Sequence, residues 1–93
     1  MKKRRIKEHS ITVDELTRAP LNLKTAEFSH IRSAAIYPDL QLEVDNGLII
    51  NKETHKIITQ NNIQNEEDLV RLCVQKRWET RWYVYYKKII GKE

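Results

Sequence analysis

The chain has few of the residues and segments that identify common classes of protein. Its 93 residues include a single cysteine, Cys73, so an intramolecular disulfide and an all-cysteine zinc site are both excluded. A lone thiol is more typical of a reducing compartment, which favours a cytoplasmic location. No apolar run approaches the roughly 20 residues that cross a bilayer, and no apolar segment follows the basic N-terminus as it would in a secretory signal. We therefore expect an intracellular protein without a membrane partner.

Motifs for catalysis and for cofactors are also missing. Only two glycines are present, so there is no glycine-rich loop to hold phosphate. Cys73 follows Leu69 and Val70 on an apolar stripe, a pattern that predicts a buried structural thiol and not a nucleophile. None of the three histidines has a second His or Cys at metal-ligand spacing; they are His9, His30 and His55. The sequence predicts a protein that is not an enzyme and has no catalytic residue, cofactor or metal.

What is present is charge, and it is segregated along the chain. Residues 1–7 carry five Lys or Arg and no acid, whereas residues 8–70 carry five Lys or Arg against eleven Asp or Glu. Residues 71–93 are basic again, with seven Lys or Arg against two acids. The net charge of +4 thus conceals two basic ends around an acidic middle. Such ends are typical of proteins that bind polyanions, although they could equally dock on acidic protein surface.

Length and composition indicate one domain preceded by a basic arm. Residues 1–9 are polar and basic, and we expect a flexible arm there. The remainder, residues 10–93, is expected to form a single α+β domain. Thr12 and Glu15 have capping-box spacing, which predicts a short helix over 13–19 ended by a proline. Apolar residues at helical spacing predict a second helix over 26–37.

The period of the pattern then changes to two. Alternating apolar residues predict a strand over 40–44, and the Asn46-Gly47 pair after it is a strong hairpin signal. The apolar run 48–50 would be the returning strand, and a third strand is expected over 56–59. We interpret residues 40–60 as a three-stranded antiparallel meander.

Asn65 opens the last segment as a helix N-cap, because three acids follow it in the first turn. The apolar stripe of this helix shifts after Lys76, since a straight continuation would turn Arg77 and Arg81 into the core. We favour one long C-terminal helix with a second apolar face. The alternative is a helix that ends near Glu79, followed by a fourth strand over 81–90, which the aromatic and β-branched content allows.

The C-terminal segment carries the main functional hypothesis. Five of the seven aromatic residues lie within 77–88, interleaved with cations. Nucleic-acid surfaces need cations for phosphates and flat rings for exposed bases. The leading hypothesis is therefore a small, non-enzymatic nucleic-acid-binding or nucleoprotein-associated regulatory protein, with DNA and RNA both open. The expected contact residues are Lys2, Lys3, Arg4, Arg5, Arg77, Arg81, Trp82, Tyr83, Tyr86, Lys87 and Lys88.

The same segment supports other hypotheses. Its rings could be core anchors whose edges are covered by the Lys and Arg stems. Aromatic residues and Arg are also enriched at protein–protein hot spots, so the alternative function is an adaptor or inhibitor that occupies a partner's surface. A homodimer whose basic ends cover the neighbour's acidic middle is compatible with either function. The burial of Trp78, Trp82 and Tyr83 discriminates between these hypotheses.

Overall fold

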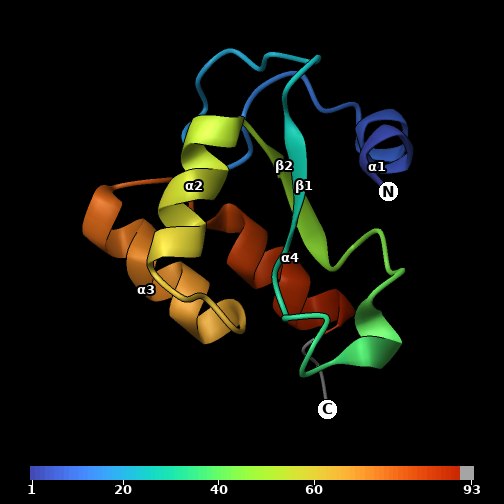
Figure 1. Cartoon of the computed structure of the whole chain (residues 1–93), viewed down its shortest axis with the longest axis vertical. Coiled ribbons are helices and arrows are strands. Elements are labelled where there is room, and N and C mark those ends of the chain that lie inside the picture. The colour runs from blue at the N-terminus through green and yellow to red at the C-terminus, as the bar shows by residue number, and fades with distance from the viewer. Residues whose placement is uncertain (91–93) are drawn as a thin grey trace.

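The computed structural model describes residues 1–90, which fold into four α-helices and one two-stranded antiparallel sheet (Figure 1). Within that range, none of the helices is long and apolar enough to span a bilayer. In chain order the elements are α1 (Lys2–His9), β1 (Glu27–His30), the 3-10 helix η1 (Pro38–Leu40), β2 (Gly47–Ile50), α2 (Lys52–Gln60), α3 (Glu66–Lys76) and α4 (Arg81–Ile89).

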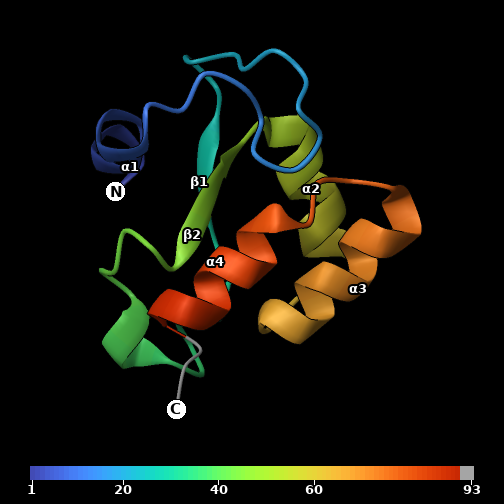
Figure 2. The same ribbon diagram turned by 180° about the vertical axis from the view of Figure 1, so that it is seen from behind.

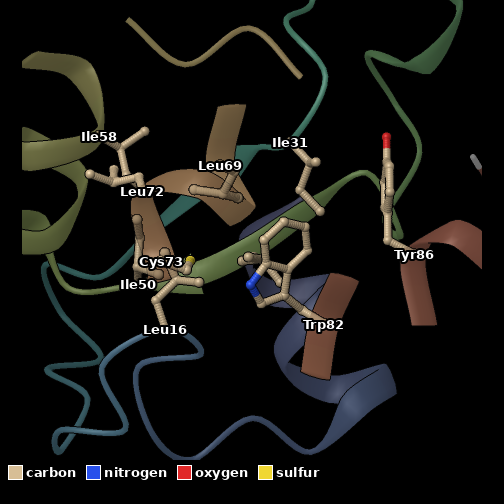
Figure 3. Packing of buried hydrophobic residues seen from close by; sticks show 10 residues of the cluster. Leu16, Ile31, Ile50, Ile58, Leu69, Leu72, Cys73, Trp82 and Tyr86 are labelled. Carbon is tan, nitrogen blue, oxygen red and sulfur yellow. The ribbon is translucent and has the colours of Figure 1, made fainter. Parts of the chain in front are cut away.

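The sheet lies between helices. Helix α1 is on one side of the strands, and α2 and α4 are on the other, with α3 beside α2 and α4 (Figures 1 and 2). Side chains of a strand alternate between the two faces, so Leu48 and Ile50 of β2 join the core with the helices while Ile49 faces the side of α1. Figure 3 shows this core, whose buried members are Leu16, Ile31, Leu48, Ile50, Ile58, Leu69, Leu72, Cys73, Trp82 and Tyr86.

The N-terminal third differs from expectation. Residues 2–9, expected as part of an irregular arm, form helix α1. The predicted helix over 13–19 is absent, and the chain instead makes turns closed by a bridge between Val13 and Pro20. Asp14 is at the centre of this turn: one oxygen of its buried carboxylate accepts the N–H groups of Leu16 and Thr17. The other oxygen accepts from the Asn51 N–H and the Thr54 hydroxyl, and these tertiary bonds fix the turn against the start of α2.

The second predicted helix, over 26–37, is also wrong, because Glu27–His30 is strand β1. The pairing with β2 places Phe28 opposite Ile49 and Ser29 opposite Leu48. This tertiary pairing outweighs the local helical spacing, since strand formation depends on cross-strand and core packing more than on intrinsic preference.

The predicted three-stranded meander does not form. Only its middle strand is confirmed, within β2; the segment 40–44 contains the end of η1 and turns, and 56–59 lies in helix α2. Asn46 and Gly47 do not make a hairpin turn, because the buried Asn46 side chain bonds to the backbone of Arg32 and Leu40. Glycine suits position 47 for another reason: the ring of Phe28 covers it, and a Cβ there would clash with Cζ of that ring unless the ring moved.

The prediction for the C-terminal helix is correct at its start and wrong about its length. Asn65 is the N-cap of α3, and its side chain accepts the N–H of Asp68 at 3.0 Å. Helix α3 then ends at a left-handed Arg77 (φ 61°), and α4 begins at Arg81, so neither the long helix nor the fourth strand is correct. Because the chain changes direction between the helices, the apolar faces of α3 and α4 both pack against the same core. Arg77 and Arg81 remain exposed to solvent.

Candidate binding groove between α1 and α4

A groove of about 480 Å³ lies between α1 and α4, on the β2 side of the sheet. Helix α1 contributes Arg5 and His9 to it, and α4 contributes Trp82, Tyr85 and Tyr86. The rings of His9 and Tyr85 meet edge to face, with centroids 6.3 Å apart. The fold thus brings the two basic ends of the described chain to opposite walls of one groove. We call this feature the α1–α4 groove.

The floor of the α1–α4 groove is the surface of the core. Ile31 and Leu48 lie there beside Trp82 and Tyr86, whose side chains point into the core in Figure 3. Trp82 is 8% exposed and Tyr86 is 1% exposed, so both are core anchors. Their edges give the groove an apolar base, and their faces are not available for stacking on a ligand.

The indole nitrogen of Trp82 is buried and has no hydrogen-bond partner, and within residues 1–90 it is the one buried side-chain polar atom in this state. In Figure 3 this nitrogen is on the side of the ring toward Cys73. Burial raises the pKa of the Cys73 thiol to about 11, and the indole N–H opposes part of that rise. No regular hydrogen bond joins the two groups, so the indole N–H is at most a weak donor to the thiol. Cys73 is therefore a protonated, inert core residue.

The α1 wall is held by an ion-pair network. Arg5 is 5% exposed and binds Glu15 through two bonds of 2.9 Å, from Nε and Nη2. Its Nη1 donates to the Val44 carbonyl at 3.0 Å. Asp45 lies 3.7 Å from Arg5 and 3.1 Å from Nε2 of His9. The guanidinium of Arg5 is fully engaged by Glu15 and Val44. It therefore attaches α1 to the rest of the protein and is not available to a ligand.

Two arginines remain at the rim of the groove. Arg18 is exposed in a left-handed turn (φ 67°) and forms no ion pair within residues 1–90. The Arg81 side chain is 86% exposed and lies 3.3 Å from Glu79, whose carboxyl pKa it lowers by hydrogen bonding. Exposed pairs of this kind contribute little free energy, so Arg81 can exchange Glu79 for an anionic ligand.

The predicted contact residues are thus divided over the molecule. The α1–α4 groove is lined by Arg5, Arg81, Trp82 and Tyr86, but only Arg81 among them has a solvent-exposed functional group. The others lie outside the groove: Lys2, Lys3, Arg4, Arg77, Tyr83, Lys87 and Lys88.

Several of those outer residues already have partners within the protein. Arg4 bonds to Glu8 in the next turn of α1. Tyr83 donates its hydroxyl to Glu67 at 2.6 Å, and Lys87 lies 3.7 Å from the same carboxylate. Tyr83 is packed against the core, as is Trp78. The aromatic residues proposed for stacking are therefore buried or engaged.

The groove contains three residues that sequence reasoning missed: His9, Arg18 and Tyr85. Tyr85 is 47% exposed, the most accessible ring on the groove side of α4. Its position four residues after Arg81 was a usable signal, because such residues share a helix face. For Arg18 no sequence signal existed, since its turn forms only around the buried Asp14.

Comparison with known proteins adds no assignment: the chain matches no protein-family model, no curated protein and no solved structure. Among residues 1–90 there is no group of three or more His, Cys, Asp or Glu arranged to hold a metal ion. The α1–α4 groove is consequently the site on which a function can be argued.

Proposed function

We propose that this protein is a non-enzymatic nucleic-acid-binding protein that holds a short single-stranded segment in the α1–α4 groove. The observation that carries this proposal is the position of Tyr85, a half-exposed ring in a groove whose rim bears Arg18 and Arg81. A lone cysteine, buried and unreactive, agrees with a cytoplasmic location as part of the same proposal.

Single-stranded nucleic acid is favoured over a duplex because of the ring. A base can stack on an aromatic side chain only when its face is exposed, and such stacking tolerates any sequence. Tyr85 meets His9 in a T-shaped arrangement and is 47% exposed, so part of its ring is available to a base. The apolar floor formed by Ile31 and Leu48 suits the remainder of an unpaired base.

The cations provide the phosphate contacts. Arg18 and Arg81 would bind phosphates next to the stacked base, and the exposed lysines Lys3 and Lys7 on α1 add positive potential nearby. Two carboxylates of the groove have partners on α1: Glu15 pairs with Arg5, and Asp45 lies close to Arg5 and His9. Glu79 would lose its pairing with Arg81 when Arg81 binds phosphate. Each phosphate contact to a single strand contributes a slope of about −0.7 in the logarithm of the binding constant against the logarithm of salt concentration.

Fluorescence anisotropy with a labelled single-stranded oligonucleotide, at two salt concentrations, tests the proposal. Tyr85→Ala should cost about 1–3 kcal/mol of binding free energy. Arg81→Ala should weaken binding and reduce the salt slope by about 0.7. Arg71→Ala is a matched control, because the Arg71 side chain is 74% exposed and lies 3.4 Å from Asp68 on α3, away from the groove. Val84→Ala controls for loss of exposed apolar surface on α4.

Absence of binding by folded protein at low salt contradicts the proposal. So does an equal loss of affinity in the Arg71 and Arg81 variants, because binding would then depend on diffuse charge and not on a site.

A second function, the protein-binding adaptor, is favoured by one observation: Val84 (60% exposed) and Ile89 (49% exposed) lie on the same helix as Tyr85. If the protein is an adaptor, the wild-type protein should capture a partner that Val84→Glu or Ile89→Glu no longer captures.

A further inference from the structure

The outer edge of strand β1 has unpaired backbone groups. Ile31 N–H donates to the carbonyl of Asn46 at 2.9 Å, which continues the ladder between β1 and β2. Because hydrogen-bonded positions alternate along an antiparallel strand, Phe28 and His30 direct their N–H and C=O groups away from β2. Within residues 1–90, these four backbone groups have no hydrogen-bond partner.

The opposite edge of the sheet is partly covered, at Ile49. The backbone N–H and C=O of Ile49 point away from β1, and its carbonyl accepts the N–H of Glu15 at 3.0 Å. The Ile49 N–H donates to the Glu15 carboxylate at 2.7 Å. Glu15 therefore satisfies both outward backbone groups of Ile49, and the outward groups of Phe28 and His30 on β1 have no such partner in the described part of the chain.

Space is available beside the open edge. A groove of about 340 Å³ runs between β1 and α2; Ser33, Ala34 and Thr59 line it together with larger residues such as His55 and Ile63. Strand β1 has no proline, lysine or bulge, the features with which proteins usually prevent edge-to-edge pairing. A further strand can therefore reach this edge.

We propose that the edge pairs with β1 of a second copy of this chain, antiparallel about a two-fold axis at Ser29. In that register Phe28 exchanges two backbone hydrogen bonds with the partner's His30, and His30 does the same with the partner's Phe28. The product is a continuous four-stranded sheet with four new backbone hydrogen bonds. A chain of this length gains buried area by association.

The side chains of β1 suit a copy of themselves. Phe28 and His30 already meet edge to face with centroids 5.2 Å apart, and pairing would join them to the same two rings of the partner. Ser29, at the axis, is small enough for the close approach of a non-hydrogen-bonded pair. Glu27 would face the partner's Ile31, so no like charges are brought opposite each other.

This inference does not depend on the proposed function. The α1–α4 groove lies on the β2 side of the sheet, so pairing through β1 leaves it open in both copies.

Sedimentation velocity of the whole chain from about 10 µM to about 1 mM tests the inference, because mass action must reveal the dimer. We expect a concentration-dependent dimer that His30→Pro converts to a monomer. Proline removes the outward N–H of residue 30 and no bond of the β1–β2 ladder, and proline is tolerated at strand edges. His30→Ala is the matched control: it loses the same imidazole contact to the Gln41 carbonyl, keeps the N–H, and should remain dimeric.

Amide exchange by NMR provides the second measurement, which needs no variant. The N–H groups of Phe28 and His30 should exchange more slowly at high protein concentration, while the exposed N–H of Leu23 should not change. A wild-type protein that stays monomeric at about 1 mM, or a dimer that persists in folded His30→Pro, would overturn the inference.

Discussion

Tyr86 donates its hydroxyl to Oδ1 of Asn46 at 2.7 Å, and both residues are inaccessible to solvent. The same oxygen accepts the N–H of Arg32 at 3.0 Å, and Nδ2 of Asn46 donates to the carbonyls of Arg32 and Leu40. All four hydrogen-bonding positions of the amide are used. This side chain therefore connects α4, the end of β1 and the segment after η1 through one buried group.

The first prediction concerns this amide. Asn46→Ala should lower the free energy of unfolding by about 2–4 kcal/mol, because it leaves several buried polar groups without partners. Tyr86→Phe should cost only about 1 kcal/mol, since Asn46 Oδ1 keeps the bond from Arg32. Urea unfolding followed by circular dichroism measures both. Tyr85→Phe, at an exposed position, is the control, and equal costs for Asn46→Ala and Tyr86→Phe would contradict the network.

A second prediction concerns the attachment of α1. Arg5→Ala should destabilise the protein by about 3 kcal/mol, because a buried Arg–Glu pair is broken and Glu15 is left without its cation. Lys3→Ala, on the exposed side of α1, should change the stability by less than about 0.5 kcal/mol. Thermal unfolding distinguishes the two variants. A basic arm without structural role would instead give both variants the melting temperature of the wild-type protein.

Trp82 supplies the third prediction. Trp82→Ala should cost about 3–5 kcal/mol of stability, because it opens a cavity next to Cys73 and Leu16 in the core. Val84 lies two residues after Trp82 on α4 and is 60% exposed, so the stability of Val84→Ala should stay within about 0.5 kcal/mol of wild type. A Trp82→Ala protein with wild-type stability would show that the ring is not a core anchor.

The fourth prediction is a pH dependence. Hydrogen bonds from Arg32 lower the pKa of the buried Glu66 carboxyl below its usual value. A lowered folded-state pKa stabilises the protein above the unfolded-state pKa of about 4.3, and that contribution is lost as the pH falls through the folded-state value. Glu66→Gln should therefore be less stable than wild type at pH 7 by about 2–3 kcal/mol, with the difference shrinking below pH of about 4.

Chemical denaturation at a series of pH values measures this difference. Glu53→Gln is the control, because Glu53 is exposed on α2 and forms no ion pair within residues 1–90. A Glu66→Gln deficit that is unchanged from pH 7 to well below 4 would indicate a packing effect, and the ion pair would then contribute nothing.

The sequence by itself determined features whose cause is local. The Asn65 cap, the start of α3 and the strand character of 48–50 follow from a side-chain hydrogen bond, a helix dipole and a short apolar run. The segregation of charge and the absence of catalytic motifs are likewise properties of the chain alone. None of these needs a contact between distant residues.

The tertiary structure decided the rest, because the competing local preferences were close in free energy. Residues 26–37 had helical spacing, yet pairing with β2 made Glu27–His30 a strand. Asn46-Gly47 is a strong hairpin signal, yet the buried amide bonds across the fold and the ring of Phe28 covers the glycine. Arg5, predicted as a free cation of an arm, is instead buried, because Glu15 lies beside it only after β2 has formed. Breaking a buried ion pair costs several kcal/mol, whereas local propensities differ by less than about one, so tertiary contacts decided these segments.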